Sequence, residues 1–288
     1  MPTLRDIRRK IASIRSTQKI TRTMKMIASS RLRRCHEELE RTRPYASKIE
    51  ELKERLLSSV RKNIHPIVME REEQKNLLIF ACASDRGLCG SFNANVNAAI
   101  DNLISQMKDQ YEKIGLYVLG KKIRDYFAKK GVPIVKEWIE LRRIEKEHIE
   151  SMVQDFMSYY LTSEFDKIVA IYTFFRSPIR QEVRTEELIP IKTKRDEGPI
   201  DYLYEPKAEY VVERFIPEYL RTKVYHMILN SQTSEHASRM NAMDNATNNC
   251  GEMINLLTLL YNKKRQESIT KEMLDIVGGA EAVKRTTF

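Results

Sequence analysis

The chain has 288 residues, with only nine glycines and nine prolines, and 31% of its residues are charged; this composition is typical of a helix-rich chain of one or two domains. No apolar run approaches the ~18 residues of a membrane-spanning helix, which argues against a transmembrane protein. The four cysteines have no C-x-x-C spacing, which argues against a disulfide framework or zinc site and predicts a reducing compartment with no metal or other cofactor.

The formal net charge is +10, and it is concentrated at one end of the chain. Residues 1–34 contain eleven lysines and arginines but one acid, Asp6. Exposed helices usually mix both signs of charge. The imbalance therefore predicts an acidic partner, which from charge alone is a nucleic acid, an anionic lipid or an acidic protein surface.

The first segment, residues 1–60, is predicted to form a long helix from about residue 3 to the high fifties. It contains no glycine, and Pro44 is expected to remove one backbone hydrogen bond and kink it. Apolar residues recur along it in steps of three and four: Leu4, Ile7, Ile11 and Ile14, then Met24, Ile27, Ile49, Leu52 and Leu56. This pattern favours a narrow coiled-coil seam.

The middle of the chain changes period. Strand-like apolar runs and helical stretches alternate, which predicts a Rossmann-like α/β domain over residues 75–195 with a mainly parallel sheet. Strands are expected over residues 77–82, 114–119, 133–139 and 167–174, helices over 94–112, 121–130 and 145–163, and a closing strand near an edge over 182–191. Residues 196–206 are expected to form a polar linker.

The turn after the first predicted strand, Ser84–Asn93, is the one candidate for a nucleotide site. Its two glycines fit neither G-x-G-x-x-G nor a P-loop, so a structural role is favoured over phosphate binding. Asp85 and Arg86 are expected to pair and brace the turn. Cys89 has no nearby histidine in the sequence that would make it a nucleophile.

The last segment, residues 207–288, is predicted to be one long helix, interrupted only by Pro217 and Gly251 before the Gly278–Gly279 pair. Its seam positions are Leu220, Val224 and Met227, then Cys250, Met253, Leu257 and Leu260. Roughly 70 helical residues span on the order of 100 Å, more than a compact domain needs. We therefore expect it to pair with residues 1–60 as an antiparallel coiled coil. The alternative is two separate amphipathic helices on ordinary cores.

Three groups of motifs together carry a family resemblance. They are Thr17–Ala28; Ser84–Gly90; and Ser234–Met240, Ala242–Ala246, Tyr261–Gln266, Ile269–Glu272 and Ile276–Ala280. In this order and spacing, the chain closely resembles the γ subunit family of F-type ATP synthases over essentially its full length.

The resemblance implies a non-catalytic rotor shaft that couples rotation of a membrane c-ring to ATP synthesis at β subunits. In that family the paired terminal helices turn inside a ring of three α and three β subunits, and the α/β domain forms a foot that meets the ε subunit and the c-ring. It also implies no cofactor, no nucleic-acid partner and no span of its own. The expected location is the cytoplasmic face of a bacterial inner membrane, as a peripheral subunit.

The resemblance also implies site residues. Met24 and Lys25 match a segment that faces an acidic lever of the β subunits, and Arg239, Gln266 and Thr270 match positions that hydrogen-bond a β-subunit loop. The apolar bearing is matched by Ile276, Val277, Ala280 and Val283. Asn241 and the polar tail Lys284–Phe288 depart from the family pattern; Asn241 is expected either to loosen the seam or to make a polar contact.

Two other classes stay open from the residues alone. One is a basic coiled-coil nucleic-acid-binding protein, although no aromatic residue precedes Tyr45 to stack on bases. The other is an α/β enzyme with helical arms, for which no motif in residues 76–195 provides support.

Overall fold

The computed structural model describes residues 3–59, 64–141, 143–193, 204–205 and 207–286, with side chains given for these except Ser59 and residues 281–286. Most of the predicted 196–206 linker therefore lies outside the described residues. The chain divides into two compact units: residues 1–27 with 242–288, and residues 28–241. The two long terminal helices, α1 (Leu4–Ser59) and α5 (Ala208–Thr286), each contribute to both units.

The unit of residues 28–241 is built on a five-stranded sheet with the order β3-β2-β1-β4-β5. The strands are β1 (Asn76–Cys82), β2 (Lys113–Leu119), β3 (Ile134–Trp138), β4 (Lys167–Phe175) and β5 (Gln181–Ile189). The first four pair in parallel, and β5 closes one edge antiparallel to β4. The predicted mainly parallel α/β sheet with a closing edge strand is confirmed.

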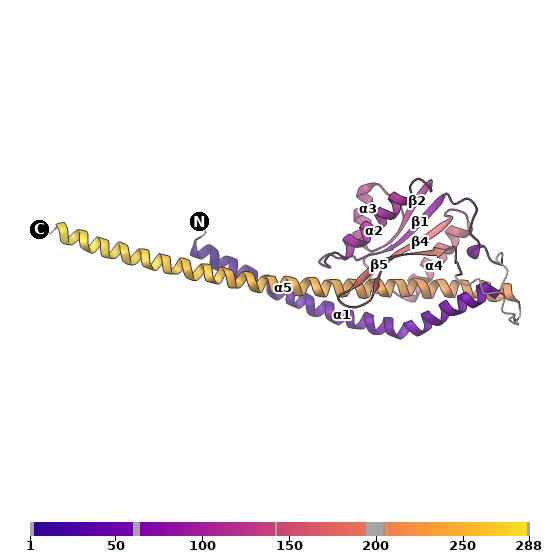
Figure 1. Ribbon diagram of the computed structural model, residues 1–288, viewed down its shortest axis with the longest axis horizontal. Coiled ribbons are helices and arrows are strands. Elements are labelled where there is room, and N and C mark those ends of the chain that lie inside the picture. Colours follow the sequence, from indigo (N-terminus) through magenta and orange to yellow (C-terminus); the bar gives the residue numbers. More distant parts are fainter. Residues whose placement is uncertain (1–2, 60–63, 142, 194–203, 206, 287–288) are drawn as a thin grey trace. The chain divides into compact units, whose positions relative to one another are not determined.

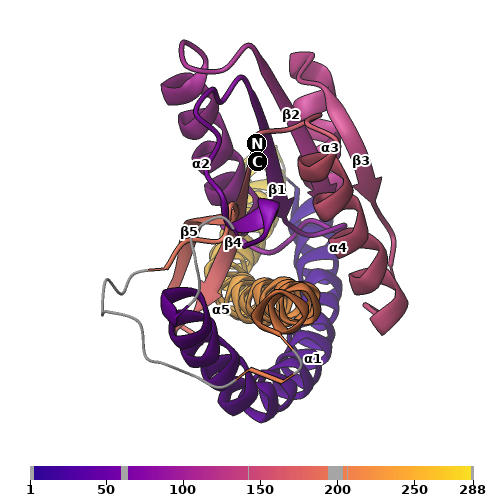
Figure 2. The ribbon, with the colours of Figure 1, turned by 90° about the vertical axis from the view of Figure 1, so that its right-hand side faces the viewer.

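Helices cover both faces of this sheet, because alternate residues of β1 point to opposite sides. On one face, Leu77 and Ile79 pack in a buried cluster with residues of α2 (Phe92–Met107) and α3 (Lys121–Lys130). On the other, Leu78 and Phe80 pack with α4 (Lys146–Leu161), α5 and the short helix η1 (Pro66–Val68). Figure 2 shows the sheet with these helices around it. The segment of α5 from Val212 to Ile228 therefore packs as one layer of the α/β domain.

Two glycines set the ends of α3. Gly120 has φ +116°, and a Cβ added there would lie 2.4 Å from the carbonyl oxygen of Ala83, so the ends of β1 and β2 approach each other closely. Gly131 ends the helix in the left-handed conformation, with φ 71°, the usual glycine C-cap. The predicted helix over residues 121–130 is confirmed at both ends.

Within this unit, α1 and α5 run antiparallel. Tyr45 donates a hydrogen bond to Glu218 at 3.1 Å, and the Lys223 ammonium lies 3.9 Å from Glu50. Pro44 lies inside α1, which remains helical through it, and Figure 1 shows α1 curving toward its C-terminal end.

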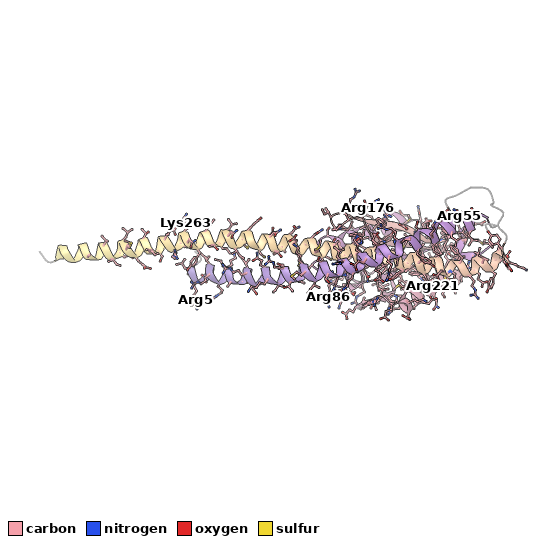
Figure 3. The ribbon with its side chains drawn as sticks, turned by 90° about the horizontal axis from the view of Figure 1, so that it is seen from below. Arg5, Arg55, Arg86, Arg176, Arg221 and Lys263 are labelled. Atoms are coloured by element: carbon pink, nitrogen blue, oxygen red, sulfur yellow. The ribbon has the colours of Figure 1, made fainter. Side chains whose placement is uncertain are left out.

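The second unit contains the start of α1 and the rest of α5, again antiparallel. Lys25 forms an ion pair with Asp244 at 2.7 Å, and the hydroxyls of Thr21 and Thr247 lie 2.8 Å apart. Figure 3 shows Arg5, near the start of α1, at the level of Lys263 of α5. The predicted antiparallel pairing of the terminal helices is confirmed, and α5 continues past the start of α1 as a single helix.

Candidate functional site

The pairing of α1 with α5 in the unit of residues 1–27 and 242–288 leaves large apolar side chains exposed. Exposed fractions are 58% for Ile20, 67% for Met26, 51% for Ile27, 67% for Leu256, 68% for Leu259 and 65% for Leu274. Apolar surface of this extent on a charged, polar chain marks a surface that another molecule covers. Within the residues that the structure describes, no helix is long and apolar enough to cross a membrane.

Three predicted seam positions, Ile27, Met253 and Leu260, are on this exposed surface, at 40–51% exposed, which corrects the seam. In the other unit Leu52 is also 48% exposed. Ile7 and Val224 are buried as expected. Polar and small residues make much of the contact instead: Gln18 bonds the carbonyl of Thr247 at 3.3 Å. The sequence period shows that α5 has an apolar stripe, but the stripe faces outward where α1 does not cover it.

The part of α1 in this unit is also basic. Seven of the eight lysines and arginines in residues 5–27 have exposed side chains, and the eighth, Lys25, is half-buried. Lys25 is engaged by Asp244, and both side chains remain about two-fifths exposed, at 40% and 43%. An exposed pair of this kind contributes ~0–1 kcal/mol and exchanges readily with another anion.

The other predicted site residues of this unit are on single-helix or half-covered surface. Met24 is half-buried, and Gln266 and Thr270 are exposed and, four residues apart, lie on one face of α5. Ile276 is 71% and Val277 57% exposed. Ala280 is also exposed, and the side chain of Val283 lies outside the described residues.

Arg239 lies in the other unit and is held by its own chain. Its guanidinium forms an ion pair with Glu235 at 2.6 Å, with side-chain exposures of 12% and 17%. It also donates to the carbonyl oxygens of Arg86 at 3.1 Å and Gly87 at 3.4 Å. Arg239 thus joins α5 to the loop after β1, whereas Gln266 and Thr270 belong to the other unit.

Around Arg239, a row of polar side chains on α5 is hydrogen-bonded to the ends of strands. Asn230, Ser231 and Ser234 are at most 4% exposed. Asn230 accepts from the N–H of Phe175 at 3.2 Å, and Ser234 donates to the carbonyl of Thr173 at 3.3 Å. Further bonds join Ser231 to Cys82, Ser238 to Gln181, and Asn241 to Pro178. Because each bond has a defined partner, α5 is fixed in one register on the sheet.

The loop after β1 is braced differently from the expectation. Asp85 does not pair with the side chain of Arg86 within the described residues; it accepts from the N–H of Lys121 at 2.9 Å, at the first turn of α3. Ser84 bonds the carbonyl of Arg86 at 2.6 Å and the amide of Asn93 at 2.9 Å. A carboxylate satisfies free N–H groups at a helix start, and this competes with the expected ion pair.

Burial sets the protonation of groups near this row. It raises the pKa of Glu235, with Arg239 opposing the shift. It lowers the pKa of His236 to about 4, assisted by the charges of Arg239 and Arg31, and raises that of the Cys35 thiol to about 11. His236 is therefore neutral and Cys35 protonated near pH 7. Among the described residues no cluster of three metal-ligating side chains is present.

Sequence reasoning missed the polar row and the partner of Lys25. The signal for the row was the run Asn230–Ser234 inside a helix whose preceding residues, Met227–Leu229, are apolar and buried. Buried hydroxyl and amide side chains need partners, and only the sheet topology shows that strand ends supply them. The predicted alternatives for Asn241 resolve to a polar contact, at 2.6 Å to Pro178.

Comparisons with known proteins found relatives over the whole chain. A protein-family model described as ATP synthase matches residues 3–283. The ATP synthase gamma chain of Chlorobium phaeobacteroides is 38% identical, with 99% of each chain covered. That of Halothermothrix orenii is 39% identical, covering 99% of this chain and all of the relative.

Solved structures show the same fold. A chain of the Euglena gracilis mitochondrial ATP synthase (OSCP/F1/c-ring) superposes with a TM-score of 0.72 at 19% identity, covering 97% of this chain and 94% of that one. A chain of the central stalk and c-ring of the Tetrahymena thermophila mitochondrial ATP synthase gives 0.60 at 24% identity, over 79% and 99%.

Proposed function

Because the chain belongs to the ATP synthase gamma chain family, we propose that it is the central rotor shaft of a proton-translocating F-type ATP synthase. The observation that carries this role is the exposed apolar and basic surface of α1 and α5 in the unit of residues 1–27 and 242–288. Such a surface suits a sleeve of partner subunits. In this role the chain catalyses no reaction itself and drives catalysis in neighbouring subunits.

The proposed partners are three α and three β subunits around the helices, the ε subunit, and the membrane c-ring at the α/β domain. The chain would be a peripheral subunit on the cytoplasmic face of a bacterial inner membrane. The segments assigned to the shaft are residues 1–60 and 207–288, and the foot is residues 75–195. The polar row on α5 supports a foot that turns with the shaft, because directional bonds resist slippage better than apolar contacts, which have no preferred direction.

Coupling requires that the shaft bind differently to each state of the surrounding sites. The exposed cations of α1 suit this, since their bonds to an acidic lever are individually weak and can be remade at each step. We assign Met24 and Lys25 to that lever, and Gln266 and Thr270 to a β-subunit loop. Arg239 belongs to the same set by resemblance, and to bind a β subunit it must first release Glu235 or use its remaining donors.

The apolar bearing is assigned to the end of α5. Ile276, Val277 and Ala280 are exposed there, and Val283 follows them in sequence. A chain ending after Ala280 should keep more coupled synthesis than one ending before Gln266. Equal loss in both would contradict the bearing assignment.

The test of the function is reconstitution of the synthase with variants of this chain. The double variant Gln266→Ala, Thr270→Ala should reduce proton-driven ATP synthesis by roughly tenfold, the effect of ~1.4 kcal/mol lost at the transition state. Asn249→Ala, at an exposed position about 100° around the same helix from Gln266, is the matched control and should leave synthesis unchanged. Equal synthesis by the wild type, the double variant and the control would refute the proposal. Failure of the chain to co-purify as a single copy with α and β subunits would also refute it.

A further inference from the structure

A cavity of about 890 Å³ lies at the carboxyl ends of β1, β2 and β3 in the unit of residues 28–241. Residues that follow each of the three strands line it, for example Asp85, Lys121 and Glu140, and α5 and α1 complete the wall. Ligand sites occupy about 300–1,000 Å³, and open parallel sheets bind ligands outside the carboxyl ends of their strands. The cavity therefore has the size and place of a small-molecule site.

The acids of the cavity are already engaged. Asp85 accepts from the N–H of Lys121 at 2.9 Å, and Glu140 pairs with the ammonium of Lys121 at 2.9 Å. Glu235 pairs with Arg239 at 2.6 Å. Ion pairs neutralise Glu140 and Glu235, whereas Asp85 keeps its negative charge, which is less than the charge of the remaining cations of the wall.

Three cations of the wall form no side-chain hydrogen bond or ion pair within the described part of the chain: Arg31 on α1, Arg86 after β1 and Lys122 on α3. Lys122 lies over the loop after β1, since its Cε is 4.0 Å from the place of a Cβ on Gly87. The lining residues include four cations and three carboxylates, so the wall has an excess of positive charge, and such an excess in a concave site favours anions. Three exposed cations suit a compact ligand with several charged oxygens better than a single carboxylate.

Beneath the cations, the wall also contains apolar and neutral polar groups. Leu119, Trp138 and Ile228 provide apolar surface, and Gln232 offers an amide that is unpaired among the described residues. A ligand that is anionic at one end and flat or apolar at the other matches this arrangement. An inorganic anion alone would use only the cationic part.

We propose that this cavity binds a small molecule carrying a pyrophosphate group, held by Arg31, Arg86 and Lys122 at the ends of the parallel strands. The cavity and its side chains carry this assignment, and the loop after β1 does not, because it has no phosphate-binding motif. Free pyrophosphate and a nucleoside diphosphate share the recognised group. A ligand in the cavity would contact Arg86, whose carbonyl accepts a hydrogen bond from Arg239 of α5. Binding would therefore affect the contact between the loop after β1 and α5.

The test is isothermal titration of the full-length chain with pyrophosphate, ADP, adenosine and sulfate at low salt. Pyrophosphate and ADP should bind, sulfate at least tenfold more weakly, and adenosine not measurably. Tighter binding of ADP than of pyrophosphate would identify the nucleotide as the ligand and the apolar wall as a contact, whereas equal binding would identify the pyrophosphate group alone. Binding of sulfate as tight as pyrophosphate, or no binding of pyrophosphate, would overturn the proposal.

Matched variants locate the site. Lys122→Gln and Arg86→Gln should each weaken pyrophosphate binding about 10-fold or more, since each removes a charged hydrogen-bond donor. Lys129→Gln is the control, because Lys129 is exposed in the last turn of the same helix and does not line the cavity. Thermal unfolding without ligand checks that the variants fold. Equal weakening by Lys129→Gln would show non-specific attraction and refute the site.

Discussion

Replacing Asn230 by leucine tests the polar row between α5 and the sheet. Pairing of β4 with β1 ends at Ile171, so Phe175 lies past the end of that ladder, and its N–H is bonded by the Asn230 oxygen at 3.2 Å. Both residues are at most 4% exposed. Leucine keeps a similar shape but cannot accept a hydrogen bond, and it leaves the Phe175 N–H buried and without that acceptor.

The expected loss follows from that orphaned donor. A buried N–H left without a partner costs ~1–3 kcal/mol, and for a domain of this size 1 kcal/mol lowers the melting temperature by about 2–4 °C. Asn230→Leu should therefore lower the melting temperature of the full-length chain by roughly 2–12 °C, measured by circular dichroism. Asn249→Leu, the same change at an exposed position of α5, should alter the free energy of unfolding by no more than ~0.5 kcal/mol. Equal melting temperatures of the Asn230 variant and wild type would show that these bonds do not stabilise the join.

Three further changes test other parts of the structure. Gly120→Ala should destabilise the α/β unit strongly, because its Cβ would lie 2.4 Å from the Ala83 carbonyl at a φ of +116°; urea unfolding measures this, and a wild-type midpoint would contradict the close approach. A double-mutant cycle of Lys25→Gln and Asp244→Asn should give a coupling of ~0–1 kcal/mol that falls with added salt, and a salt-independent coupling would contradict an exposed pair. Burial alone would raise the pKa of Asp166, but hydrogen bonds from the Arg71 guanidinium and from the main-chain N–H groups of Lys75 and Asn76 outweigh it and lower that pKa below 3.8. Ionised Asp166 therefore stabilises the fold above pH ~4, and this contribution is lost as the pH falls through its folded pKa. Asp166→Asn should flatten the acid limb of stability measured by urea titration between about pH 2 and 5, and an unchanged slope would refute the assignment.

Much of the fold follows from sequence because its signals are local. The continuous apolar run of β1 and the glycine after Lys130 predict a buried strand and a helix end, and both are observed. The faces of the long helices were harder to predict. Ile27 and Met253 continue an apolar period, yet both are about half exposed. Periodicity shows that a stripe exists, but which stretch of it the chain itself covers depends on the tertiary register.

The candidate site was harder to derive for the same reason. In place of the expected Asp85–Arg86 pair, Asp85 accepts a hydrogen bond from the start of α3. This partner can be predicted only when it is known that β1 lies beside β2, the strand that precedes α3. Ser231 and Ser234 look like solvent-facing helix residues until the ends of β1 and β4 are placed against them. Long-range partners decide the role of polar side chains, and sequence spacing alone does not supply them.

The 79 residues of α5 form one uninterrupted helix. The direction in which a side chain points from it therefore depends on how many residues separate that side chain from a fixed contact. The contact between the hydroxyls of Thr21 and Thr247 is one such fixed point. Each residue beyond it turns the helix by ~100° and advances it by ~1.5 Å. One residue inserted between Gly251 and Gln266 would aim Gln266 and Thr270 about 100° away from their present direction while leaving every side chain intact. In a rotary device such an insertion alters timing, so the length of this stretch is as strictly specified as the chemistry of its residues.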